Sequence, residues 1–346
     1  MKTVLAVLVA VTLAAGSLAV ESLIAQSKYS TDPAPGYQVP RTPDGKPDLQ
    51  GVWGNNGVTP MTRPRQWKDK QTLTDAEVEE LKMMAARSVD ESGDAIFGNF
   101  VQQLLDARDK GEYKQVSYDP TTGNYNQFWM AEREWDNRTS LIVDPADGQL
   151  PPLTAEAQAR RAAAAARPRT RGPADGPEDR PLSERCISYG APRTGANYNS
   201  YVQIMQSPDT VVLLQEMIHD ARVVPMTNKP HLPANIRQLH GDPRGRWEGD
   251  TLVVETTNYL NGVQGSTNNV KVTERYTRVS PDFINWAITI DDPATWTQPY
   301  TFMIRLKKTD GLIYEYACHE GNYGMEGILA GARAEEAKAA KSKSKR

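Results

Sequence analysis

The chain of 346 residues has the composition of a globular protein, with 39% hydrophobic and 24% charged residues. This composition excludes a wholly disordered, collagen-like or multi-span membrane protein. The formal net charge of −3 provides no basic field over the whole chain, so we expect no nucleic acid partner.

The first element is an apolar N-terminal run. Residues 3–20 contain no charged side chain, and small residues lie near Ala19, where a signal peptidase would cut. We therefore predict a signal peptide over residues 1–26 and a periplasmic or secreted mature protein. An uncleaved N-terminal anchor is the alternative. No later run is long and apolar enough to cross a bilayer, so no membrane span is expected after cleavage.

Residues 27–150 are predicted to form an irregular and helical wrapping arm. Proline and glycine are frequent up to about residue 70, and proline cannot donate a backbone hydrogen bond. Thr74 and Glu77 have the spacing of a capping box and predict a helix over 74–88. Apolar residues at spacings of three and four predict a second helix over 95–110, and residues 140–143 are a short strand candidate.

Two later segments have a biased composition. Residues 151–182 are rich in alanine and arginine and then in proline and glycine, which predicts a solvated helix over 154–167 followed by a linker. Residues 326–346 are rich in alanine, lysine and glutamate and predict a helical to disordered basic tail.

Residues 183–325 are predicted to be the β core. Turn residues separate nine strand-like runs, at 199–206, 210–218, 221–226, 245–248, 251–259, 270–279, 283–290, 300–308 and 312–318. The sequence 272–278 alternates, so Val272, Glu274, Tyr276 and Arg278 should share one face. A mainly β fold follows, in which an antiparallel meander closes into a barrel. A two-sheet sandwich is the alternative.

Four motifs give a family resemblance. They are TPDGKPDLQGVW at 42–53, QEMIHDAR at 215–222, GRWEGDTLVVET at 245–256 and YEYACHEGNYG at 314–324. These segments are similar to those of a widespread family of exported bacterial proteins of unassigned function, and the third resembles a hairpin of lipocalin-like β-barrels. The resemblance implies an exported lipocalin-like barrel and implies no reaction.

The chain contains two cysteines, Cys186 and Cys318. They lack the Cys-x-x-Cys spacing of a zinc or redox site. In an oxidising compartment they can pair, and we predict a disulfide. Two buried free thiols are the alternative.

Histidine and carboxylate pairs are the candidates for catalysis, because imidazole exchanges protons near neutral pH and a carboxylate can orient it. The predicted catalytic residues are His219, His319, Asp220, Glu320 and Tyr323. On a straight strand, His219 and Asp220 would face opposite sides. If the chain turns there, both could point into a barrel mouth. The alternative without catalysis is a turn histidine beside an Asp–Arg ion pair.

The predicted substrate-binding residues are polar and aromatic side chains of the β core. Arginine can hold a substrate anion, tyrosine can act as an acid and a glutamate can orient the base. They are Tyr189, Arg193, Glu216, Arg222 and Trp247.

No cofactor is predicted, because the sequence lacks a phosphate-binding glycine loop and a serine nucleophile elbow. A zinc site formed by His219, His231 and His240 is the alternative, although their spacing matches no compact ligand pattern.

Two functions follow, and both have a small molecule as partner. The first is an exported, cofactor-free enzyme of the lyase, isomerase or hydratase type that acts on a small, partly apolar organic substrate. The second is a non-catalytic carrier of an apolar or aromatic ligand. A structural envelope protein is a third possibility, and the sequence does not indicate an oligomeric state.

Overall fold

A single antiparallel sheet dominates the structure, a computed structural model that describes residues 33, 35–88, 99–111, 133–168 and 170–343. Within these residues the strands follow the order β5-β4-β3-β1-β10-β9-β8-β7-β6, and β2 pairs with β10 beside this path. The strands are β1 Gly51–Gly54, β2 Ile142–Asp144, β3 Tyr201–Gln206, β4 Thr210–Gln215, β5 Ala221–Pro225, β6 Asp242–Glu248, β7 Thr251–Thr257, β8 Lys271–Arg278, β9 Phe283–Asp291 and β10 Tyr300–Thr309.

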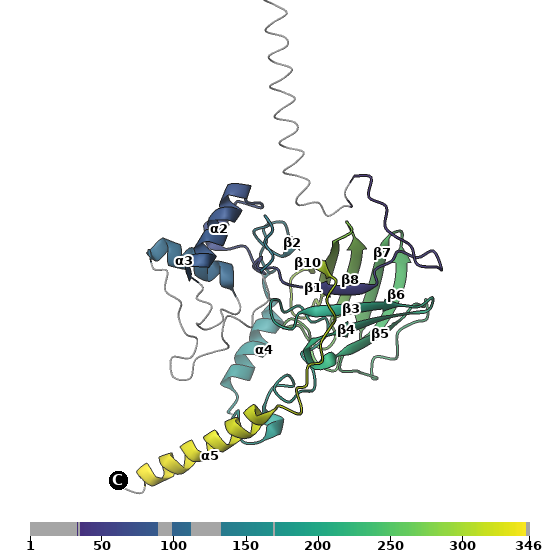
Figure 1. The fold of residues 1–346 in the computed structure, drawn as a ribbon. Helices are drawn as coiled ribbons and strands as arrows, with labels where there is room; N and C mark the ends of the chain where they lie inside the picture. Colours follow the sequence, from purple (N-terminus) through teal and green to yellow (C-terminus); the bar gives the residue numbers. More distant parts are fainter. Residues whose placement is uncertain (1–32, 34, 89–98, 112–132, 169, 344–346) are drawn as a thin grey trace, which may run out of the picture.

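The helices lie outside the sheet (Figure 1). α2 and α3 lie together on one side and share a small apolar core with the segment that follows β1. α4 and α5 lie on another side, below the strands in this view. Their bounds are α2 Asp75–Ser88, α3 Phe100–Lys110, α4 Ala155–Ala166 and α5 Tyr323–Lys343, and the short 3-10 helices are η1 Arg65–Trp67, η3 Pro177–Asp179 and η4 Met217–His219.

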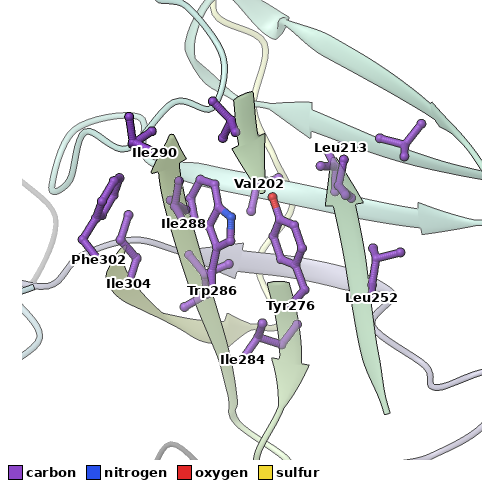
Figure 2. Packing of buried hydrophobic residues seen from close by; sticks show 14 of the residues in the cluster. Val202, Leu213, Leu252, Tyr276, Ile284, Trp286, Ile288, Ile290, Phe302 and Ile304 are labelled. Atoms are coloured by element: carbon purple, nitrogen blue, oxygen red, sulfur yellow. The ribbon is translucent and has the colours of Figure 1, made fainter. Parts of the chain in front are cut away.

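The inner face of the sheet holds the main core. Strands β1, β3, β4 and β5 cross the line of β6, β7 and β8, so the sheet folds over this face (Figure 1). The alternation predicted for β8 is confirmed, since Val272, Glu274, Tyr276 and Arg278 are buried. Tyr276 and Trp286 stack with their ring centroids 5.4 Å apart, among the aliphatic side chains of neighbouring strands (Figure 2).

The prediction of a closed barrel is wrong. The sheet curls until β5 meets β6, but only a parallel bridge between Met226 and Gly245 links these edges within the described residues. Pro225 in β5 and Pro243 in β6 have no backbone N–H group, so neither edge can offer a full ladder of donors. The result is a barrel-like sheet that stays open along one seam.

Most predicted helices are confirmed. The Thr74–Glu77 capping box forms at α2, where the Thr74 N–H donates to Glu77 over 2.8 Å and the Glu77 N–H donates to the Thr74 hydroxyl over 3.3 Å. α3 begins at Phe100, while the predicted residues 95–98 lie outside the described part, as does the predicted signal peptide. The C-terminal tail is helical through Lys343.

One predicted strand is absent, and another was missed. Residues 312–318 form no strand, and their Leu312 and Tyr314 side chains are 81% and 74% exposed. Both edges of β10 are already paired, to β9 on one side and to β1 and β2 on the other, so the segment that follows has no free edge beside it. β1, in contrast, lies inside the predicted arm and joins the sheet between β3 and β10.

A buried ion pair spans the interior of the sheet. Arg222 on β5 donates to both Glu274 oxygens on β8, with Nη1–Oε1 and Nη2–Oε2 distances of 3.0 and 2.5 Å. Glu274 Oε1 also accepts from the Tyr276 hydroxyl at 2.8 Å and from the Trp286 indole at 3.2 Å. Burial alone would disfavour the charged guanidinium, but the adjacent carboxylate raises the pKa of Arg222.

Replacing one member of this ion pair should destabilise the fold more than replacing both. We expect Glu274→Leu to lower the free energy of unfolding by about 3 to 5 kcal/mol, because it leaves Arg222 charged and unpaired in the core. The double variant Arg222→Met/Glu274→Leu should recover most of that loss. Urea denaturation of the three proteins measures this, and a double variant as unstable as Glu274→Leu would contradict it.

Candidate functional site

A cavity of about 440 Å³ opens at one end of the sheet. Its walls are two loops, 188–195 and 259–264, with Leu182, Ser183 and Leu239 completing the lining. The first loop follows Cys186, whose disulfide to Cys318 is confirmed with an S–S distance of 1.98 Å. Asn322 also donates to the Glu184 carbonyl at 3.0 Å, so the segment before α5 holds the base of this loop.

Ser188 joins an imidazole and a carboxylate at the cavity wall. Its Oγ lies 2.8 Å from His240 Nε2 and 2.9 Å from Asp220 Oδ2, and it accepts from the Gly190 N–H at 2.8 Å. A hydroxyl has one proton to donate. The arrangement that satisfies every contact has Ser188 donating to Asp220 and the His240 Nε2–H donating to Ser188.

This arrangement decides what each group can do chemically. Both lone pairs of the Ser188 hydroxyl accept hydrogen bonds, so Ser188 is a bridge and not a nucleophile. His240 keeps Nδ1 as its basic nitrogen. Burial lowers the pKa of His240 below 6.5, and Arg222 lowers it further, while Asp220 opposes them. His240 is therefore neutral at neutral pH and can accept a proton.

Arg193 brings a positive charge to the same cavity. Its Nη2 donates to the Tyr198 carbonyl at 2.9 Å, and its guanidinium lies 5.6 Å from the centre of the Tyr189 ring. Burial lowers the pKa of Arg193, while the charges of Glu216 and Asp220 oppose that shift. The charges of Glu216 and Asp220 offset part of the charge of Arg193, so the site suits a neutral, polar ligand better than a strong anion.

Glu216 lies buried at the end of β4. Its Oε1 accepts from the Tyr314 N–H at 3.5 Å, whereas its Oε2 is buried without a hydrogen-bond partner in the described part of the chain. A buried carboxylate oxygen without a donor is costly, because it has lost its hydration. Glu216 does not line the cavity, and it acts on the site through its charge near Arg193.

The predicted site residues divide into two groups. Tyr189 and Arg193 line the cavity, Asp220 contacts its wall through Ser188, and Glu216 lies close enough to act on Arg193. The others lie elsewhere: Arg222 is in the core, Trp247 is half-buried against it, and His219, His319, Glu320 and Tyr323 are exposed.

The chain turns at His219 and does not continue as a straight strand, which decides between the two backbone alternatives considered for His219 and Asp220. Ile218 and His219 have φ angles of 58° and 43°, and the turn directs Asp220 to Ser188 and leaves the imidazole exposed. The alternative of a turn histidine beside an Asp–Arg ion pair holds in its first part, since His219 is an exposed turn residue, whereas Arg222 pairs with Glu274.

Ser188 was not among the site residues predicted from the sequence, nor was the role of His240 as its partner. His240 entered only as a possible zinc ligand with His219 and His231. The three do not converge: His231 Nδ1 lies 3.0 Å from Asp242 Oδ2, and His219 is exposed. Among the described residues, no group of three histidines, cysteines or carboxylates could hold a metal. The sequence feature that could have pointed to Ser188 was its position two residues after Cys186, which the predicted disulfide fixes in place.

No helix in the described ranges is both long and apolar enough to cross a membrane.

Comparisons with known proteins give little more. No protein-family model matches the sequence, and no curated protein matches it significantly. A search of solved structures finds a crystal structure of a mutant of the fluorescent protein UnaG, at 11% sequence identity and a TM-score of 0.21. The match covers 38% of this chain and 86% of that chain. A likeness at this level identifies no ligand or activity.

The lowered pKa of His240 predicts a pH-dependent stability. Because the unfolded chain binds this proton more tightly, stability is fully present above about pH 6.5 and is lost as the pH falls from there through the lowered pKa. We expect Tm to drop over this range, and to drop less in His240→Gln. Scanning calorimetry between pH 7 and pH 5 measures it. His219→Gln, which removes an exposed imidazole, is the control, and an equal slope in His240→Gln and the native protein would refute the assignment.

Proposed function

We propose that this protein is an exported enzyme that moves a proton on a small, partly apolar organic substrate bound in the cavity of loops 188–195 and 259–264. One observation supports this above the others: His240 and Asp220 meet at Ser188, on the wall of a cavity that Arg193 also lines. Burial lowers the pKa of His240 and so keeps the ring neutral, with a nitrogen that can accept a proton.

The proton transfer uses both ring nitrogens. A C–H or O–H bond of the substrate breaks, and its proton binds to His240 Nδ1, which Ser188 leaves unoccupied. His240 lies behind Ser188 and is not among the residues that line the cavity, so this step requires the imidazole to reach the substrate past that wall. The Nε2–H keeps its hydrogen bond to Ser188, and the Ser188 hydroxyl keeps its hydrogen bond to Asp220. The nearest carboxylate oxygen of Asp220 lies 3.7 Å from Nε2. The carboxylate stabilises the positive charge that develops on the ring. Returning the proton to another carbon of the substrate isomerises it. If instead the electron pair of the broken C–H bond expels a β-hydroxyl group, which takes the proton and leaves as water, the reaction is of the lyase or hydratase type.

Other side chains would position the substrate. Tyr189 offers an aromatic wall and a hydroxyl, and Arg193 offers a partly neutralised cation. No cofactor enters this step. His219 and His319, the bases favoured by the sequence, are exposed, so we assign the base to His240 instead.

The compartment and the fold type are proposed on separate grounds. The apolar run at residues 3–20 indicates export to the periplasm or the medium, and the Cys186–Cys318 disulfide is compatible with an oxidising compartment. The GRWEGDTLVVET segment forms the β6–β7 hairpin of the curled sheet, which supports a lipocalin-like type of barrel with an open seam.

Proton abstraction can be detected before the product is known. Pools of small neutral ketones, hydroxy ketones and aldehydes are incubated with the protein in D₂O, and ¹H NMR follows the loss of C–H signals. We expect at least one compound to exchange or react, and His240→Gln to slow it by about a hundredfold or more. Asp220→Asn should slow it less, because Asp220 acts through Ser188.

The exposed histidines supply matched controls. His219→Gln and His319→Gln should leave the rate unchanged. A rate that falls in His319→Gln and not in His240→Gln would overturn the assignment of the base. Saturable binding without exchange in any pool would favour the non-catalytic carrier.

A further inference from the structure

The Cys186–Cys318 disulfide joins two segments of irregular chain. Cys186 lies two residues before Ser188, at the start of the cavity loop, residues 186–195, and Cys318 lies between β10 and α5. The bond therefore ties the wall of the cavity to the chain that leads into α5.

The two ends of the disulfide differ in exposure. Cys186 is buried, with 4% of its surface exposed, whereas Cys318 is half-buried and its neighbours Ala317 and His319 are exposed. Thiol–disulfide exchange begins when a thiolate reaches one of the two sulfurs directly. An external thiol can therefore attack Cys318, and Cys186 is then the sulfur that leaves.

Asn322 supports Cys186 as the leaving sulfur. Its Nδ2 donates to Cys186 Sγ over 3.4 Å. Negative charge develops on the departing sulfur when the S–S bond breaks, and a hydrogen bond to a charged acceptor is stronger than one to a neutral acceptor. The Asn322 amide therefore stabilises the departing thiolate more than it stabilises the intact disulfide.

The backbone at Cys186 favours release of the cavity loop. Its φ is 56°, in the left-handed region that residues with a β-carbon adopt at a cost. When the bond to Cys318 is broken, Cys186 is free to return to a negative φ. That rotation moves the chain that carries Ser188, whose hydroxyl contacts Asp220 and His240.

We propose that the Cys186–Cys318 bond is a site of reversible thiol–disulfide exchange, at which a dithiol reductant opens the cavity loop while the sheet remains folded. A thiolate of the dithiol bonds to Cys318 Sγ, and the electron pair of the S–S bond passes to Cys186 Sγ, which takes a proton from water. The second thiol of the reductant loses its proton and attacks the reductant sulfur of this mixed disulfide, which releases Cys318 as a thiol. Two electrons thus reduce the protein, and the dithiol becomes a disulfide.

The opening is local because the sheet does not depend on this bond. Neither cysteine lies in a strand or belongs to the main core of the sheet. Loss of turnover on reduction rests on the proposed function, since it follows from Ser188 leaving His240. Exchange at sulfur and opening of the loop are measured without a substrate, so they test this site even if the proposed function fails.

Trapping with a monothiol identifies the attacked sulfur. The native protein is treated with glutathione, quenched with iodoacetamide and digested, and mass spectrometry locates both groups. We expect glutathione on Cys318 with the alkyl group on Cys186, about ten times more often than the reverse, because Cys318 is the more exposed residue. An equal mixture or the reverse pattern would overturn the proposal.

The rate of reduction by dithiothreitol, followed by thiol titration, tests Asn322. We expect Asn322→Ala to slow reduction about fivefold or more, because the departing thiolate loses a hydrogen bond. A purely structural role would instead speed reduction, since Asn322 also holds the Glu184 carbonyl. A faster or unchanged rate therefore contradicts the role of Asn322, and Asn235→Ala, which removes an exposed asparagine, is the control.

Hydrogen exchange read by mass spectrometry detects the opening. The Ile187 N–H donates to the Leu182 carbonyl and the Gly190 N–H to Ser188, so the oxidised loop has protected amides. In dithiothreitol, peptides over 186–195 should exchange about tenfold faster or more, while peptides of β7 to β9 stay protected at the same labelling times. Oxidised glutathione should restore the protection of the loop.

The double variant Cys186→Ser/Cys318→Ser is the matched control. Its loop should exchange rapidly without reductant and should not respond to dithiothreitol, and the reduced native protein gives the same test if this variant does not fold. A loop that stays protected in the reduced protein would show that the bond does not hold it. Loss of protection in β7 to β9 together with the loop would make the disulfide a clamp on the whole fold, which also contradicts the proposal.

Discussion

The ion pair between Arg222 and Glu274 constrains the whole sheet. A guanidinium and a carboxylate can remain in an apolar core only when they contact each other, so β5 and β8 must approach across the interior. In the sheet order β5 is the first strand of the path and β8 lies in the opposite half, so their approach requires the sheet to curl. The aromatic stack of Tyr276 and Trp286 then fills the space beside the pair and donates two further hydrogen bonds to it.

The same constraint places the candidate site. Asp220 precedes Arg222 by two residues, so the chain that enters the core at Arg222 leaves Asp220 at the end of the sheet. There Asp220 meets Ser188, on a loop that the disulfide holds from the other side. His240 lies just before β6, at the open seam, and completes the cluster. Strands from both ends of the sheet and one covalent link therefore converge on a single cavity.

Local patterns in the sequence predicted eight of the strands of the back half, the capping box at Thr74 and the alternation of β8, since each depends on neighbouring residues. They did not predict β1, because four residues with two glycines become a strand only through their partners. The strand predicted at residues 312–318 does not form for the converse reason, because its alternating pattern has no free strand edge to pair with. The Ser188 contacts likewise join distant segments, so nearness in the sequence favoured His219 and His319 instead.

The position of β1 also determines the order in which the sheet can be assembled. β3, β4 and β5 form one meander, and β6 to β10 form another, each with contacts between consecutive strands. Among the described strands, β1 is the one that pairs with both meanders, since Val52 pairs with Gln203 on one side and Thr309 on the other, while the far edges share the single bridge of Met226 and Gly245. Strand pairs that are close in the sequence form quickly, whereas distant pairs form slowly because closing a long loop costs more conformational entropy. Two preformed hairpin arrays joined by a late N-terminal strand are therefore the kinetic route that this topology favours.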